Sequence, residues 1–129
     1  MPRVVRYNTT MKTKPANTDF LNGVPELLIL SLVSRRPMYG YQLVQAIRQS
    51  TDGTLEFGEG CVYPILHRLE AEGMLGSKRE TVGGRSRVVY RINVRGRKQL
   101  ASTTTAWQKI VEAVSHALHG GEHGQPGLA

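Results

Sequence analysis

The sequence lacks most of the features that would place a protein outside the cytoplasm. It has one cysteine in 129 residues, so it forms no internal disulfide, and a single thiol suits a reducing compartment. Its most apolar stretch, residues 27–33, contains Ser31 and is far shorter than the roughly 20 residues that a helix needs to cross a bilayer. A secretory signal has an apolar segment after its basic residues, and the basic residues near this N-terminus are not followed by one. We therefore expect a cytoplasmic protein with no membrane partner.

Catalytic and metal-binding patterns are also missing. No Ser/His/Asp set, phosphate-binding loop or suitably spaced pair of acids is present, so we predict that the chain is not an enzyme. Three histidines, His116, His119 and His123, lie near the C-terminus. Their spacing is loose, and no cysteine or carboxylate pair supports them as ligands. We expect no metal and no cofactor.

Positive charge is abundant and unevenly placed. The chain has 17 Lys and Arg against 10 Asp and Glu, a formal net charge of +7. Residues 74–98 hold eight basic side chains and one acidic one, and residues 1–24 hold four basic and one acidic, while the other segments are slightly acidic. Such an excess suggests a nucleic-acid partner, although it also fits other anionic surfaces or a solvated face. The secondary structure that carries the basic residues has to distinguish between these interpretations.

Hydrophobic spacing predicts three short helices, a hairpin and a long final helix. Residues 1–23 have no apolar period and are expected to form a basic flexible arm. The helices are expected from Pro25 to residue 36, from Tyr41 to about residue 50, and over residues 61–72, with residues 38–40 as a turn. Gly73 would end the third helix in the left-handed conformation.

Two strands, residues 74–80 and 87–93, would flank a glycine-containing tip at 82–86, so the basic cluster lies on a β-hairpin. Asn93 is a plausible N-cap for the final helix. In that helix, predicted over residues 96–119, apolar side chains advance in steps of three and four, close to a coiled-coil seam. Residues 120–129 are expected to be a flexible tail.

The third helix separates into two faces. Val62, Ile65, Leu66 and Leu69 follow the i, i+3, i+4, i+7 spacing of a core face, and Tyr63 and His67 share another. The order of elements predicts a mainly α fold with a two-stranded β wing, a winged helix-turn-helix domain over residues 24–95. In such a domain the third helix enters the DNA major groove, and the basic hairpin contacts the flanking phosphates.

Three segments resemble the PadR family of bacterial transcriptional regulators. Residues 37–43 read Pro-Met-Tyr-Gly-Tyr-Gln-Leu, residues 62–73 contain Tyr-Pro-Ile-Leu-His-Arg-Leu-Glu-Ala-Glu-Gly, and the hairpin contains Gly-Gly-Arg. The resemblance implies a homodimeric repressor that binds a pseudo-palindromic operator on double-stranded DNA and is released by a small phenolic or other aromatic effector. The single C-terminal helix is similar to that of the smaller PadR subgroup, in which this helix packs across the dimer axis.

Nine side chains are predicted to contact DNA: Tyr39, Gln42, Tyr63, His67, Arg68, Lys78, Arg79, Arg85 and Arg87. Two have alternatives, because Tyr63 could pack under the wing with only its hydroxyl exposed, and Arg68 could pair with Glu72 one turn on. Four side chains are predicted to form the dimer and effector interface: Trp107, Ile110, Val111 and Val114. Simple packing is the alternative for the tryptophan.

Two further alternatives stay open. A winged-helix module that docks a protein, with weak or no DNA binding, would also fit the order of elements. Cys61 stands at the start of the third helix, where the PadR family usually has serine or threonine. A thiol there could serve as a redox signal if it were exposed and its pKa were lowered.

Overall fold

A computed structural model of the chain describes residues 5–6 and 16–123. Its helices are α1 (Ala16–Arg35), α2 (Gly40–Ser50), α3 (Glu59–Ala71) and α4 (Val94–His123). Its strands are β1 (Val5–Arg6), β2 (Met38–Tyr39), β3 (Leu55–Glu56), β4 (Leu75–Val82) and β5 (Arg85–Ile92). Strands β2, β5 and β4 form an antiparallel sheet in that order, and β1 pairs with β3 in parallel.

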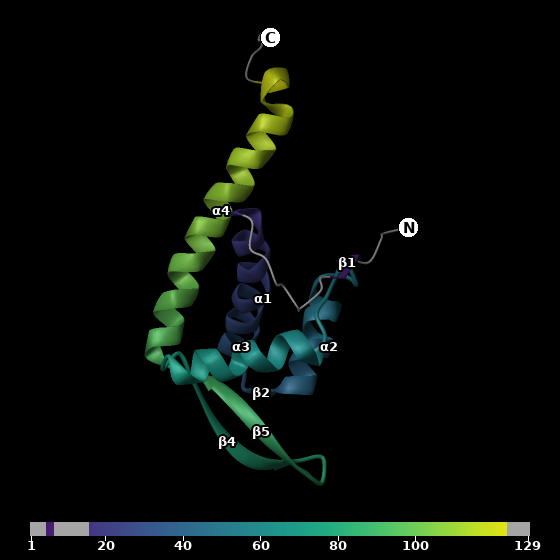
Figure 1. Cartoon of the computed structure of the whole chain (residues 1–129), viewed down its shortest axis with the longest axis vertical. Coiled ribbons are helices and arrows are strands. Elements are labelled where there is room, and N and C mark those ends of the chain that lie inside the picture. Colours follow the sequence, from purple (N-terminus) through teal and green to yellow (C-terminus); the bar gives the residue numbers. More distant parts are fainter. Residues whose placement is uncertain (1–4, 7–15, 124–129) are drawn as a thin grey trace.

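The three short helices surround one apolar core. Its fully buried side chains come from α1, α2, α3, the link between β3 and α3, and the start of β4: Ile29, Leu30, Leu43, Ile47, Phe57, Val62, Leu66, Leu69 and Leu75. The predicted core face of the third helix is confirmed, since three of its four members are fully buried and Ile65 is half-buried. Figure 1 shows the β4–β5 hairpin projecting from one end of this core, while the C-terminal half of α4 extends beyond it at the other end.

Glycines shape two tight bends, as the sequence predicts. Gly83 and Gly84 have φ of 59° and 80° and form the two-residue turn between paired Val82 and Arg85. Gly73 has φ of 80° and ends α3, and the Met74 N–H donates to the Leu69 carbonyl at 2.9 Å. The fold is therefore mainly helical with a β wing.

Helix boundaries differ from the prediction at both ends of the chain. Helix α1 begins at Ala16, within the predicted arm, and Pro25 lies inside it rather than in its first turn. A proline removes one helical hydrogen bond, but tertiary packing can keep the flanking turns in register, and Pro25 is buried. Helix α4 continues through Gly120 to His123, because glycine is a weak helix former and not an absolute breaker. Residues 1–4, 7–15 and 124–129 of the predicted arm and tail lie outside the described residues.

One local assignment near the sheet was also wrong. Residues 38–39, predicted as a turn, form β2 and add a third strand to the wing, with Met38 opposite Tyr90 and Tyr39 opposite Val89. Two residues are too few for an alternating pattern to show. Asn93 does stand at the predicted N-cap position, directly before Val94, and its carbonyl accepts a hydrogen bond from the Arg97 N–H at 2.9 Å. Its side-chain Nδ2 donates to the Gly73 carbonyl at 3.2 Å and so fastens the start of α4 to the end of α3.

Candidate nucleic-acid interface

Helix α3 presents Tyr63 and His67 from adjacent turns. Their ring centroids are 6.3 Å apart, and His67 is exposed while Tyr63 is half-buried. The Tyr63 ring lies against Gly40, where a Cβ atom would collide with the ring. Tyr63 thus packs against the start of α2 while part of its side chain stays accessible, and its contact with DNA stays a prediction.

The wing is braced against the start of α2. The Arg87 guanidinium stacks on the Tyr39 ring with 4.4 Å between its central carbon and the ring centroid, a cation–π contact. Its Nε atom is buried without a hydrogen-bond partner among the described residues. Arg79 Nη1 donates to Ser86 Oγ at 3.2 Å. Side chains of β2, α3 and the wing together line a cavity of about 220 Å³: Tyr39, Tyr63, Arg79, Ser86, Arg87 and Val88.

The remaining wing charges differ in how far they are neutralised. Arg91 Nη2 lies 2.7 Å from Glu80 Oε2 in an ion pair. Lys78 and Arg79 on β4, and Arg85 beside the glycine turn, are exposed. Exposed cations on a protruding hairpin are suited to phosphate contacts, because such contacts depend on charge and on side chains long enough to reach the DNA backbone.

Gln42 has a structural task at the start of α2. Its Oε1 accepts a hydrogen bond from the Tyr39 backbone N–H at 3.3 Å, so the side chain turns back toward the first turn of the helix. The first backbone N–H groups of α2 lie in this same turn, next to the cavity beneath the wing. This end of α2 is therefore suited to an anionic oxygen of the DNA backbone.

Arg68 is held by two carboxylates. Its Nη2 donates to Glu26 Oε1 at 2.6 Å, and its Nη1 donates to Glu72 Oε1 at 3.3 Å. The hydrogen bond to Glu26 is the main cause of a raised pKa for the Arg68 guanidinium. The predicted i, i+4 pair with Glu72 is thus confirmed. Arg68 therefore holds α3 to α1, and because its side chain is still 46% exposed, its contact with DNA stays a prediction.

Glu26 was missed by the sequence prediction. It is the one acidic residue in the apolar stretch 24–33 of α1. A lone carboxylate among apolar residues usually has a partner when it is largely buried, and that signal could have identified it.

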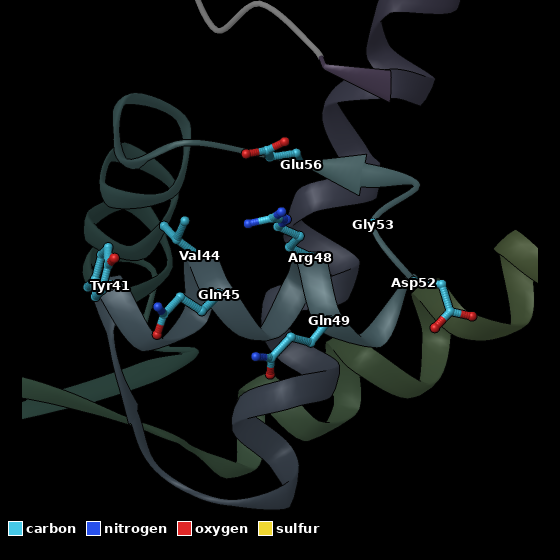
Figure 2. A pocket seen from close by; sticks show the side chains of 8 residues that line it. All are labelled: Tyr41, Val44, Gln45, Arg48, Gln49, Asp52, Gly53 and Glu56. Carbon is cyan, nitrogen blue, oxygen red and sulfur yellow. The ribbon is translucent and has the colours of Figure 1, made fainter. Parts of the chain in front are cut away.

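A second, larger depression lies on the outer side of α2. It has a volume of about 580 Å³, and Figure 2 shows Tyr41 at one end of it and Arg48 and Glu56 pointing into the same space. The charged residues lining it are Arg48, Asp52 and Glu56. This mixture of signs does not favour phosphate, so the basic wing is the better candidate for DNA contact. Tyr41 is exposed here.

Helix α4 carries an apolar stripe that the rest of the described chain leaves uncovered. Ile110, Val111, Val114 and Leu118 are 43%, 43%, 52% and 72% exposed. With half-buried Trp107 they follow the i, i+3, i+4, i+7, i+11 spacing of one helix face. They lie in the part of α4 that extends past the core in Figure 1.

The other reactive side chains give little support to a site. Burial raises the pKa of the Cys61 thiol, which disfavours the reactive thiolate. Among the residues that the structure describes, no three His, Cys, Asp or Glu side chains come together as metal ligands. The side chain of His123 lies outside them.

A helical core, a basic hairpin and a third helix that presents polar side chains beside that hairpin define a winged-helix protein. Residues 29–102 match the transcriptional regulator PadR-like family. The chain belongs to this family of transcriptional regulators, which act by binding DNA and are not enzymes. No helix in the described part of the chain is long and apolar enough to span a membrane.

Known proteins similar to the chain agree with this assignment. A transcriptional regulator of Mycobacterium tuberculosis is 34% identical over 96 residues, which cover 74% of this chain and 87% of that protein. A solved structure from Streptococcus mutans has a TM-score of 0.70 and 30% identity, covering 77% of this chain and 90% of that one. A PadR-like transcriptional regulator from Bacillus cereus has a TM-score of 0.68 and 28% identity, covering 78% and 96%.

Proposed function

We propose that the chain is a homodimeric transcriptional repressor that binds a pseudo-palindromic operator and is released by a small aromatic effector. In this proposal Tyr63 and His67 contact base edges in the major groove. The phosphates are contacted by the basic residues of the hairpin, Lys78, Arg79, Arg85 and Arg87. The observation that carries the proposal is the concentration of exposed positive charge on the wing beside a helix face of nearly neutral polar side chains.

The proposed dimer forms through α4. The exposed stripe from Ile110 to Leu118 forms a continuous apolar face, and its exposure to water is unfavourable. A second copy of the same helix would cover it. A two-fold dimer places two α3 helices on one side of the assembly, and a palindromic operator has the matching symmetry.

The proposed effector site lies beside Trp107. This side chain is half-buried on the same stripe, so an effector between two α4 helices would lie against an indole ring. Because Trp107 is the single tryptophan, its fluorescence reports on this place alone. Titration with phenolic acids and planar aromatic dyes should quench it at concentrations that release DNA. Release without any change in fluorescence would rule out this site.

A series of salt concentrations can test whether the wing contacts phosphates and α3 contacts bases. The probe is the duplex that the wild-type chain selects from a random-sequence pool, and the readout is its fluorescence anisotropy. Arg85→Ala should weaken binding to all sequences and lower the slope of log affinity against log salt by about 1.8, which is about 0.9 for each of the two Arg85 side chains that a dimer brings to the operator. Arg48→Ala removes the same charge from the outer side of α2 and is the matched control.

Substitution of His67 by alanine should instead change sequence preference while keeping most of the salt slope. Equal effects of Arg85→Ala and Arg48→Ala would contradict the assignment of phosphate contacts to the wing. An unchanged base preference in the His67 variant would contradict the proposed base contact.

A further inference from the structure

Glu26 connects three helices through one carboxylate. It lies on α1, and its side chain is only 16% exposed. Oε1 accepts a hydrogen bond from Arg68 of α3 at 2.6 Å, and Oε2 accepts one from Gln99 of α4 at 3.4 Å. The helix that faces DNA and the helix that carries the apolar stripe are therefore both fastened to the same residue.

A second attachment between α3 and α4 lies where the two helices meet. The Asn93 backbone N–H donates to the Met74 carbonyl at 2.9 Å, and its side chain donates to the Gly73 carbonyl. Gly96, in the first turn of α4, lies so close to Met74 that a Cβ atom would collide with its carbonyl oxygen. One attachment of this kind allows α4 to pivot, whereas a second one farther along both helices fixes the angle between them.

We infer that Glu26 is a positioning residue that sets the angle between α3 and α4 and so selects the spacing of the two operator half-sites. The inference rests on the proposed function, because it needs dimerisation through α4 and base contact through α3. In such a dimer the separation of the two α3 helices depends on how each is held to its own α4. One added base pair moves a half-site by about 3.4 Å and rotates it by about 35°.

The test compares operators that differ only in spacing. The probe is the duplex selected by the wild-type chain from a random pool, together with derivatives that have one base pair inserted or deleted at the centre of symmetry. The full chain is used, and binding is measured by anisotropy. We expect the affinity of the wild type to fall at least about tenfold on either change, because one of the two half-sites would then fit its α3 helix poorly. Glu26→Ala should reduce this discrimination to within about threefold while leaving the salt slope unchanged.

Glu72→Ala is the matched control. It removes the other carboxylate that pairs with Arg68, but Glu72 lies at the end of α3, directly after its last residue, so the attachment to α1 and α4 remains. This variant should discriminate spacing as the wild type does. Gln99→Ala removes only the α4 contact and should also relax discrimination. It serves as the second variant if Glu26→Ala loses helical signal in circular dichroism.

The outcomes separate the two proposals. Wild-type discrimination in Glu26→Ala, or in Gln99→Ala where that variant is needed, would overturn the role of Glu26 and leave the proposed function standing. Equal relaxation in Glu72→Ala would also overturn it, because any loss of Arg68 pairing would then suffice. A wild-type chain that selects no duplex from the pool would refute the proposed function itself.

Discussion

Replacing Gly96 by alanine should destabilise the chain, although glycine to alanine usually stabilises a helix. Within α4 the exchange gains about 1 kcal/mol of helix propensity. The new Cβ, however, would collide with the Met74 carbonyl and with the Ile92 side chain. Overpacking typically costs about 1–3 kcal/mol, and the upper part of that range applies because a main-chain carbonyl cannot rotate away. The net loss in free energy of unfolding should be about 2 kcal/mol, or about 7 °C in Tm.

Urea unfolding followed by circular dichroism measures this loss, with Gly23→Ala as its control. Gly23 lies in α1, where a Cβ atom would meet no other atom within 4 Å. The control should therefore gain up to about 1 kcal/mol. If Gly96→Ala were as stable as the wild type while the control behaved as expected, the close contact between α4 and the end of α3 would be refuted.

Three further predictions concern other parts of the chain. Val114→Glu should weaken self-association in sedimentation experiments by about thirtyfold, because a carboxylate in the apolar contact costs about 2 kcal/mol or more; Lys109→Glu, on the opposite side of α4, should not. Iodoacetamide should alkylate Cys61 more slowly at pH 7.5 in the folded chain than in urea, because burial raises the thiol pKa, and equal rates would contradict this. Arg87→Ala should lower the free energy of unfolding by about 0.5–2 kcal/mol through loss of the stacked ring contact, whereas exposed Arg85→Ala should cost less than about 0.5 kcal/mol.

The sequence predicts the parts of the fold that depend on neighbours along the chain. The core face of α3 follows from helical spacing, and the hairpin follows from alternating strands around Gly83 and Gly84. The end of α3 at Gly73 follows from the left-handed conformation that glycine tolerates. These features need no knowledge of distant contacts, and the structure confirms them.

The differences arise where distant contacts decide. Strand β2 forms because Met38 and Tyr39 pair with β5. Two residues are too few to show an alternating apolar pattern in the sequence. Asn93 stands at the predicted N-cap position, but its side-chain hydrogen bond to the Gly73 carbonyl depends on where α3 ends. The stacking of Arg87 on Tyr39 depends on the pairing of β2 with β5, so the sequence alone did not predict it, while the contact of Arg87 with phosphate stays a proposal.

The most direct test of the proposed homodimeric regulator is sedimentation of the chain with the duplex that it selects from a random pool. A homodimer that reads sequence should bind as two chains per duplex, with an affinity at least about 10³ times that for a scrambled duplex of the same composition at physiological salt. One chain per duplex, or equal affinity for the selected and the scrambled duplex, would contradict this proposal.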